Sequence, residues 1–470
     1  MQPRVCGYCR EWLLDRPDHV TETMRVTPGI DLDAVRRMRR YLFVLAALVA
    51  CDSAEEPLPD DESPADPAKD DLPGYKVTGQ HAWYLAGDAL TAGQDHLELS
   101  AATPAATHYV DLFMDGKYVK RAHRAAGVFK FSIDLKTTAI GAHKVLLAAD
   151  GSHTAFSSVR FQRSYPLYVA VSNDWDTSDH GDDKLERQDR LHAGHPHLVI
   201  THFVGPYTFT DTTVAPTRVQ YLVDWLKKYR DTAGDEIGLH VHPYCNFVTA
   251  AGVTCRTSPS FAKASDATGY TVVLSSYTQA ELEKMFLKAA SLFQAHGLAR
   301  PTSFRAGGWT AQLHVIKALG TAGHVADSSG CNWARLEEWQ NVAGAQLYQW
   351  NQANWGPIDE TSQPYYPSTT DILADAAPHL PVLEVPDNGA LVDYVTAAEM
   401  IAMFKKNFAG AALPEVRVYS IGYHPVDFSE EFFNRIDGAL TEIDKHLAAD
   451  DRGPVIYARV SDLTKVFPKP

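Results

Sequence analysis

Two carboxylates follow a run of apolar residues in the segment Leu167 to Thr177, which reads LYVAVSNDWDT. Side chains alternate between the two faces of a β-strand with a period of two. Asp174 and Asp176 are therefore expected to project from the carboxyl end of this predicted strand on the same side. Two carboxylates that meet there indicate a metal ligand and a general base.

Two histidines show the same spacing in the segment Glu236 to Tyr244, which reads EIGLHVHPY. His240 and His242 are expected to share one face of a second strand, because the residue between them points to the other face. One carboxylate and two imidazoles can supply the three protein ligands of a catalytic zinc site, which keeps a fourth position open for water. The sequence therefore predicts a metal site made of one Asp and two His.

The elements that must position these groups follow from the pattern after Ser164, where apolar stretches of strand length alternate with amphipathic segments. The candidate strands are residues 167–172, 197–204, 236–242, 303–308, 324–329, 381–386, 416–424 and 454–460. The candidate helices include residues 217–231, 278–297 and 396–410. A strand–helix pattern repeated about seven times predicts an α/β fold with a distorted (β/α)7-type barrel over residues 164–470.

Barrels of this kind carry their catalytic groups at the carboxyl ends of the strands. Asp174, His240, Arg305 and His424 all fall at such ends. The predicted barrel would thus bring an acid, a histidine, an arginine and a second histidine to one rim.

Residues 75–163 show a different pattern, with short alternating stretches separated by turn signals. Asp115 and Gly116 lie between two such stretches, and Asp-Gly in that position is a strong hairpin signal. We expect a small all-β immunoglobulin-like sandwich here. The expected roles of this domain are spacing, packing on the barrel domain, or weak carbohydrate binding.

The amino-terminal part has the pattern of an export signal. The basic residues 36–40 precede the apolar residues 41–50, a run too short to span a bilayer. The residues up to Cys51 resemble a bacterial lipobox, in which the cysteine is lipidated and becomes the first mature residue. Residues 1–50 would then be removed, and residues 1–37 are expected to be an over-extended start. The alternative interpretation of the apolar run is a short buried helix.

Residues 51–74 begin with the predicted lipidated cysteine and continue as an acidic, Pro-rich stretch. Such a stretch cannot bury enough apolar surface to offset its ordering entropy, so we expect a disordered tether. The chain is predicted to be an exported lipoprotein of the periplasm or cell surface, which contacts the membrane through the lipid alone.

Three cysteines follow Cys51 in the chain. Export implies an oxidising compartment, where exposed thiols tend to pair. Cys245 and Cys255 flank a short loop after the histidines and are predicted to form a disulfide. Cys331 would then be a lone buried thiol.

The 470 residues carry a formal net charge of -15. Nucleic acid is not expected as a partner, because no basic cluster occurs beyond residues 36–40. A neutral or cationic substrate fits this charge better.

Residues 165–465 resemble the polysaccharide deacetylase family, the NodB-homology domain of carbohydrate esterase family 4. The segment NDWD resembles the first motif of that family, and the resemblance implies that Asp174 is the base and Asp176 a metal ligand. The segment LHVHP resembles the second motif and implies His240 and His242 as the other ligands. The family usually has adjacent acids and three residues between the histidines, whereas one residue intervenes in each pair here.

The remaining motifs lie further along the chain in family order. FRAGGW at 304–309 resembles the third motif and implies that Arg305 lies beside the base. GYHP at 422–425 resembles the fifth and implies His424 as the general acid. LEVPDNG at 383–389 lies where the fourth motif falls, and Asp387 there is the candidate to orient His424.

The resemblance implies a metal-dependent hydrolase that removes N-acetyl groups from an amino-sugar polysaccharide or oligosaccharide. Zinc is the expected metal, with cobalt or nickel as alternatives. Tyr244 and Trp309 are candidates to stack on sugar rings, although core packing would explain either side chain equally well. His202 is a candidate neighbour of the site, and packing explains it at least as well.

Two other functions remain open at this stage. A surface lipoprotein with a deacetylase fold could bind carbohydrate without turnover. The shortened second motif favours this interpretation. A hydrolase with the same metal site could instead act on an O-acetyl ester or on another C–N amide.

Overall fold

The computed structural model describes residues 74–470 except 126, 151, 153 and 154. The predicted export signal, Cys51 and the tether up to residue 73 lie outside the described residues. Among the described helices, none combines the length and the apolar character needed to cross a bilayer.

The first described region consists of two β-sheets that share one apolar core. One sheet contains β1 (Lys76–Thr78), β3 (His96–Ala102) and β6 (Val128–Asp134). The other contains β2 (Trp83–Leu85), β8 (Ser157–Ser164), β7 (Gly141–Ala149), β4 (Tyr109–Met114) and β5 (Lys117–His123), in that order. The predicted hairpin is present, because Asp115 and Gly116 connect β4 to β5 with positive φ angles of 50° and 77°.

The second region is built on a parallel sheet, which confirms the predicted barrel architecture. Its strands are β9 (Leu167–Asp174), β10 (Ile200–Val204), β11 (Glu236–Val241), β12 (Ser303–Ala306), β13 (Ala326–Asp327), β14 (Leu383–Glu384), β15 (Arg417–Tyr423) and β16 (Val455–Tyr457). They run in the order β14-β13-β12-β11-β10-β9-β15, and β16 pairs with the first residues of β9.

The segment after β14 connects the two ends of this order. The backbone N–H of Gly389 donates to the carbonyl of Ser420 on β15 at 2.8 Å, and the N–H of Val392 donates to Gly422 at 2.9 Å. The ring of backbone hydrogen bonds therefore continues from β14 to β15 through irregular chain rather than through a regular strand. The sequence predicted a distorted barrel, and this irregular segment is the place where the distortion lies.

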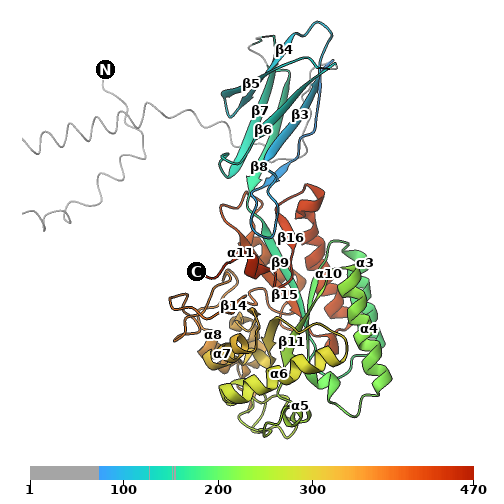
Figure 1. The fold of residues 1–470 in the computed structure, drawn as a ribbon, viewed down its shortest axis with the longest axis vertical. Coiled ribbons are helices and arrows are strands. Elements are labelled where there is room, and N and C mark those ends of the chain that lie inside the picture. Colours follow the sequence, from blue (N-terminus) through green and yellow to red (C-terminus); the bar gives the residue numbers. More distant parts are fainter. Residues whose placement is uncertain (1–73, 126, 151, 153–154) are drawn as a thin grey trace, which may run out of the picture. The chain divides into compact units, whose positions relative to one another are not determined.

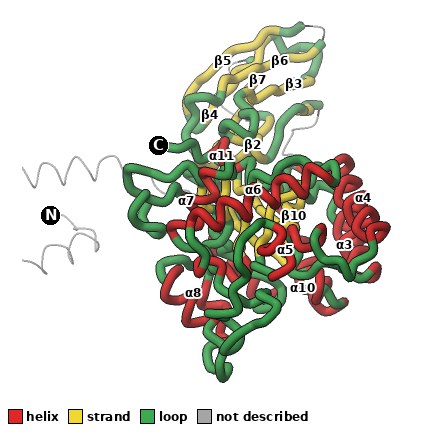
Figure 2. The backbone as a smooth tube through the Cα atoms, turned by 60° about the horizontal axis from the view of Figure 1, so that its bottom comes forward, coloured by secondary structure: helices red, strands yellow, loops and turns green. Residues whose placement is uncertain are grey.

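Helices surround these strands (Figures 1 and 2). They are α3 (Asp182–Gly194), α4 (Pro216–Thr232), α5 (Cys245–Ala250), α6 (Gln279–Ala295), α7 (Leu313–Thr321), α8 (Leu347–Trp355), α9 (Ala397–Asn407), α10 (Glu430–Ile443) and α11 (Leu463–Val466). The three helices predicted from apolar spacing correspond to α4, α6 and α9. A capping box of Thr278 and Glu281 starts α6, and one of Thr396 and Glu399 starts α9.

Successive side chains of β9 point alternately into the barrel interior and toward the surrounding helices. Val169 and Val171 pack into the apolar cluster that includes residues of α9 and α10. Tyr168 and Ala170 belong to a second cluster with Phe203, together with residues of β13, β14 and β15. The apolar side chains of this second cluster fill the barrel interior on the amino-terminal side of Asp174. The acids at the carboxyl end of β9 therefore lie next to a packed core rather than over a channel.

Candidate metal centre

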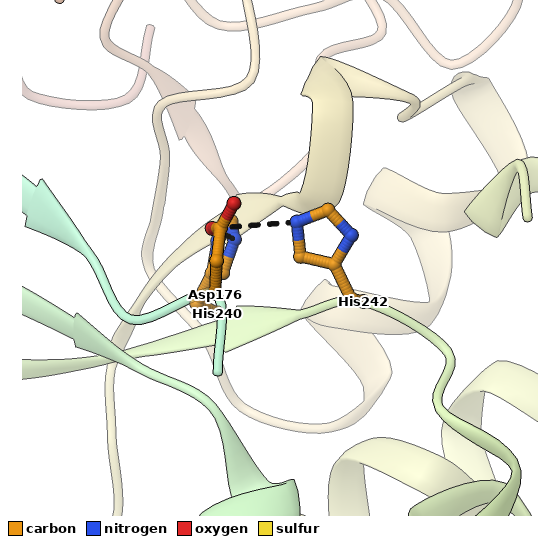
Figure 3. Close-up of side chains that lie close together, drawn as sticks. All are labelled: Asp176, His240 and His242. Carbon is orange, nitrogen blue, oxygen red and sulfur yellow. Dashed lines mark hydrogen bonds and ion pairs between the residues drawn. The ribbon is translucent and has the colours of Figure 1, made fainter. Parts of the chain in front are cut away.

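Three side chains converge on one point at the carboxyl ends of β9 and β11. The Nε2 atom of His240 lies 3.0 Å from Oδ1 of Asp176, and Nε2 of His242 lies 3.4 Å from the same oxygen. All three side chains are buried, with at most 10% of any of them exposed. Figure 3 shows the His242 imidazole pointing toward the Asp176 carboxylate, with His240 behind it. The structure thus brings together the three predicted ligands.

The hydrogen bonds of the two imidazoles show which ring nitrogen carries a hydrogen. Nδ1 of His240 lies 3.0 Å from the carbonyl oxygen of Arg305, and Nδ1 of His242 lies 2.7 Å from that of Tyr270. A carbonyl oxygen only accepts, so Nδ1 must carry the hydrogen in each ring. Where Nε2 carries no hydrogen it presents a lone pair to the Asp176 carboxylate, and a bound cation between these acceptors makes the contact favourable. Where Nε2 carries a hydrogen it donates to the carboxylate instead. Metal-binding histidines have this arrangement.

The carboxyl group of Asp176 is ionised in this site. Burial alone would raise the pKa of its carboxyl group, but His424, His242 and His240 hold that pKa well below its usual range. The second oxygen, Oδ2, accepts a hydrogen bond of 2.7 Å from the hydroxyl of Tyr270 and lies 3.9 Å from Nε2 of His424. The donor set of one carboxylate and two imidazoles suits zinc, cobalt or nickel.

Asp174 is paired with the predicted arginine. The guanidinium Nη1 of Arg305 donates to Oδ1 of Asp174 at 3.1 Å and to the Ser172 hydroxyl at 2.9 Å. Nε and Nη2 of Arg305 donate to the backbone oxygen and the hydroxyl of Ser328. Arg305 is fully buried, so its orientation is fixed by these contacts. The guanidinium therefore holds the Asp174 carboxylate in a fixed orientation.

His424 lies across the site from these groups and pairs with a carboxylate that the sequence did not indicate. Its Nδ1 lies 2.9 Å from Oδ2 of Asp393. Burial lowers the pKa of His424, but Asp393 and Asp176 more than offset this effect and raise the pKa to about 10. His424 is therefore an imidazolium at neutral pH, which is the state that a general acid needs.

The prediction that Asp387 orients His424 is wrong, because Asp393 occupies that position. Oδ2 of Asp387 instead accepts from the indole N–H of Trp309 at 3.2 Å and lies 3.9 Å from the Arg305 guanidinium. Burial raises the pKa of Asp387 to about 6, with Arg305 opposing that effect. Asp387 thus interacts with Trp309 and Arg305 rather than with His424.

A cavity of about 600 Å³ opens onto these groups. Its lining includes Asp174, Asp176, His240, His242 and His424, the aromatic residues Phe261, Tyr270, Trp309, Trp339, Tyr394 and Phe432, and the acids Glu338, Asp393 and Asp427. No Lys or Arg belongs to this lining. Of the two predicted stacking residues, Trp309 lines the cavity, whereas Tyr244 packs against Tyr207 and Tyr270 outside it.

The predicted disulfide and the predicted lone thiol are both present. Cys245 and Cys255 form a disulfide across α5, in the loop that follows His242. Cys331 is a buried free thiol.

The described residues contain a second group of potential ligands, made of His192, His202 and Asp235. Nε2 of His202 lies 2.8 Å from Oδ2 of Asp235, and Nε2 of His192 lies 3.0 Å from the same oxygen. None of the three lines the cavity. Nδ1 of His202 contacts the side chain of Asn173 and the ring packs edge-on against Trp225, so His202 belongs to a buried polar network beneath α4.

Two residues of the site, Tyr270 and Asp393, were missed by sequence reasoning. Tyr270 lies in the irregular chain between α5 and α6, and Asp393 lies between β14 and α9. Neither has a spacing that relates it to the strand pattern. An acid a few residues after the fourth motif was the available signal for Asp393, and no comparable signal exists for Tyr270.

Comparison with known proteins yields structural neighbours and no sequence relatives. No model of a known family and no curated protein sequence matches the chain. A Mycobacterium smegmatis protein described as a polysaccharide deacetylase is 14% identical, with a TM-score of 0.37 over 64% of this chain and 89% of the other. A family 4 carbohydrate esterase from Streptomyces lividans is 10% identical, with a TM-score of 0.32 over 63% and 95%.

A peptidoglycan deacetylase from Bacillus subtilis is 12% identical, with a TM-score of 0.32 over 64% of this chain and 92% of the other. At these identities and TM-scores the similarity carries no information about the activity of this chain.

Replacing Gly307 by Ala should weaken metal binding without unfolding the barrel. A Cβ atom at Gly307 would lie 2.6 Å from Cγ of His242, so the imidazole must shift from the position in which its Nε2 lies 3.4 Å from Asp176. We expect zinc affinity to fall by about tenfold or more, as for other changes that misplace a metal ligand. Titration of the metal-free protein against a chromophoric chelator measures this. Gly194→Ala is the control, because its Cβ would meet only Asp437 at 3.8 Å; equal affinity of the two variants would contradict the prediction.

Replacing Asp393 by Asn should move the alkaline limb of the pH–rate profile to lower pH. His424 must be protonated to act as an acid, and Asp393 raises its pKa. Without that carboxylate the proton leaves at lower pH, and the rate then declines by about tenfold per pH unit above the new limb. Glu338→Gln removes a carboxylate from the same cavity, and it should leave the limb in place. An unmoved limb in Asp393→Asn would refute the role of this pair.

Proposed function

We propose that this protein is a metal-dependent hydrolase that removes N-acetyl groups from an amino-sugar polysaccharide. One observation carries the proposal. The Nε2 nitrogens of His240 and His242 face the ionised carboxylate of Asp176 within 3.4 Å, in a cavity that also holds Asp174 and His424. The sequence motifs that resemble the polysaccharide deacetylases supply the same residues in the same roles.

The donor set fits a catalytic cation with three protein ligands. Such a cation, when bound, activates water and polarises the carbonyl of an acetamide. Zinc is the proposed metal because two imidazoles and one carboxylate are a common zinc donor set.

Asp174 is the proposed general base. Its Oδ1 is held by Arg305, and the carboxylate lines the cavity beside the three ligands. A carboxylate in this position accepts a proton from the attacking water, and Arg305 fixes its orientation. The backbone carbonyl of Arg305 also holds His240, so base and ligand are fixed by one residue.

His424 is the proposed general acid. A departing amine needs a proton, and an imidazolium with a pKa of about 10 carries one throughout the neutral range. Asp393 holds the ring through Nδ1, so Nε2 faces the cavity and Asp176. The base must be ionised and the acid protonated, which gives a bell-shaped dependence of rate on pH.

The lining of the cavity favours a neutral or cationic sugar polymer. Five carboxylates and six aromatic side chains line it, and the lining contains no Lys or Arg. Aromatic faces such as that of Trp309 suit the apolar faces of sugar rings. An amino sugar that gains positive charge on deacetylation is compatible with this field, whereas a polyanionic substrate is not.

We propose in addition that the chain is exported and lipidated at Cys51, on the pattern of residues 36–51. A Cys51→Ser variant expressed in a bacterial host should lose incorporation of labelled palmitate and should no longer partition into the membrane fraction. Labelling equal to that of the wild type would contradict lipidation at this residue.

Replacing Asp176 by Asn should remove both the bound metal and the activity. The amide cannot supply the negative charge that balances a cation between two lone pairs, so the purified variant should hold less zinc. Acetate release should fall by about 100-fold or more, because the cation supplies most of the catalysis in such sites. The assay measures acetate released from chitin oligomers, peptidoglycan and poly-N-acetylglucosamine, with metal content from elemental analysis.

The control is Asp427→Asn, which removes a carboxylate from the same cavity and should retain bound metal. Full activity in Asp176→Asn, or wild-type protein that binds no divalent metal, would refute the proposed function. Polysaccharide binding that survives chelation, without acetate release by the wild type, would favour the binding protein. Release from O-acetylated xylan alone would reassign the bond to an ester.

A further inference from the structure

Tyr270 reaches the metal centre from a loop that contributes none of the predicted site residues. Its hydroxyl donates to Oδ2 of Asp176 at 2.7 Å. Its carbonyl oxygen accepts from Nδ1 of His242 at 2.7 Å, and its ring lies 4.3 Å from the ring of His242. One residue therefore contacts two of the three ligands, through both its backbone and its side chain.

The loop is built to hold Tyr270 in this position. The buried carboxylate of Asp266 accepts hydrogen bonds from the backbone and side chains of Thr268 and Thr271, on both sides of Tyr270. The carbonyl of Thr268 accepts from the backbone N–H of Cys245 at 2.8 Å. Gly269 has a φ of +83°, and a Cβ atom there would lie 2.3 Å from the carbonyl of Pro243. The turn is thus tightly packed against the chain that follows His242.

The two oxygens of Asp176 have separate partners as a result. Oδ1 faces Nε2 of His240 and Nε2 of His242. Oδ2 is occupied by the Tyr270 hydroxyl. A carboxylate held in this way would present Oδ1 to a bound cation, because Oδ2 has a hydrogen-bond donor of its own.

We propose that Tyr270 is a positioning residue of the metal centre, whose hydroxyl orients Asp176 so that it binds the cation through Oδ1. This inference rests on the proposed metal site. It adds a residue that lies outside every motif, and it assigns the loop between α5 and α6 to the metal centre.

Packing alone would account for the ring of Tyr270 but not for its hydroxyl. The ring stacks on Tyr244 at 5.1 Å between centroids with an interplanar angle of 18°. Phenylalanine preserves that stack and the contact with His242, and it removes only the hydrogen bond to Asp176. A Tyr270→Phe variant therefore separates the two explanations.

The experiment measures zinc affinity of the metal-free protein by competition with a chromophoric chelator. Tyr270→Phe should bind zinc about 10–100-fold more weakly than the wild type, the range found when a group that orients a metal ligand is removed. The metal-free variant should keep the circular dichroism spectrum and the cooperative thermal unfolding of the metal-free wild type. With Co²⁺ in place of zinc, its visible absorption should differ from that of the wild type, because the geometry of the carboxylate ligand changes.

Tyr244→Phe is the matched control. It removes a hydroxyl from the other ring of the same stack, and its zinc affinity should be unchanged. Zinc affinity and a Co²⁺ spectrum equal to the wild type in Tyr270→Phe would overturn the inference, whether or not turnover is altered. Failure of the wild type to bind zinc or Co²⁺ would refute the proposed function itself, and it is detected before any variant is made.

Discussion

The site depends on a buried contact in which two imidazole nitrogens meet one carboxylate oxygen. The carbonyl oxygens of Arg305 and Tyr270 fix the hydrogen on Nδ1 of His240 and His242, so the Nε2 nitrogens of both rings face the carboxylate of Asp176. Acceptors that face one another away from water are costly unless a cation lies between them. The neighbouring charges have partners of their own, since Asp174 pairs with Arg305 and His424 with Asp393. The triad is therefore the place where a cation would balance two imidazole nitrogens and one carboxylate.

The register of the parallel sheet connects this contact to the rest of the catalytic groups. His240 on β11 pairs directly with Arg305 on β12. The backbone of Arg305 therefore reaches the imidazole of His240, while its side chain crosses the barrel to Asp174 on β9. A shift of β12 by one residue would reverse the faces of its side chains and break both connections. The metal ligand and the base are thus coupled through one strand.

Strand periodicity predicted the parts of the site that lie on strands and failed for the parts that lie on loops. The period-two spacing placed Asp174 and Asp176 at one strand end, and His240 and His242 at another, and the structure brings these groups together. Arg305 follows from the same logic. Asp393 and Tyr270 come from irregular chain, whose path depends on tertiary contacts such as the turn around Asp266. The error at Asp387 has the same origin, because the acid inside the fourth motif is not the acid that lies beside His424 in space.

The short spacing of the two histidines has a structural explanation in the next strand. Nε2 of His240 and of His242 reach the same oxygen although the residues are only two apart, and the ring of His242 must then lie over the end of β12. Gly307 leaves room for that ring, since a Cβ atom there would lie within 2.7 Å of three ring atoms. The compact histidine pair and this glycine of the FRAGGW segment therefore depend on each other. One packing contact thus links the segments LHVHP and FRAGGW, which neither segment shows when it is considered alone.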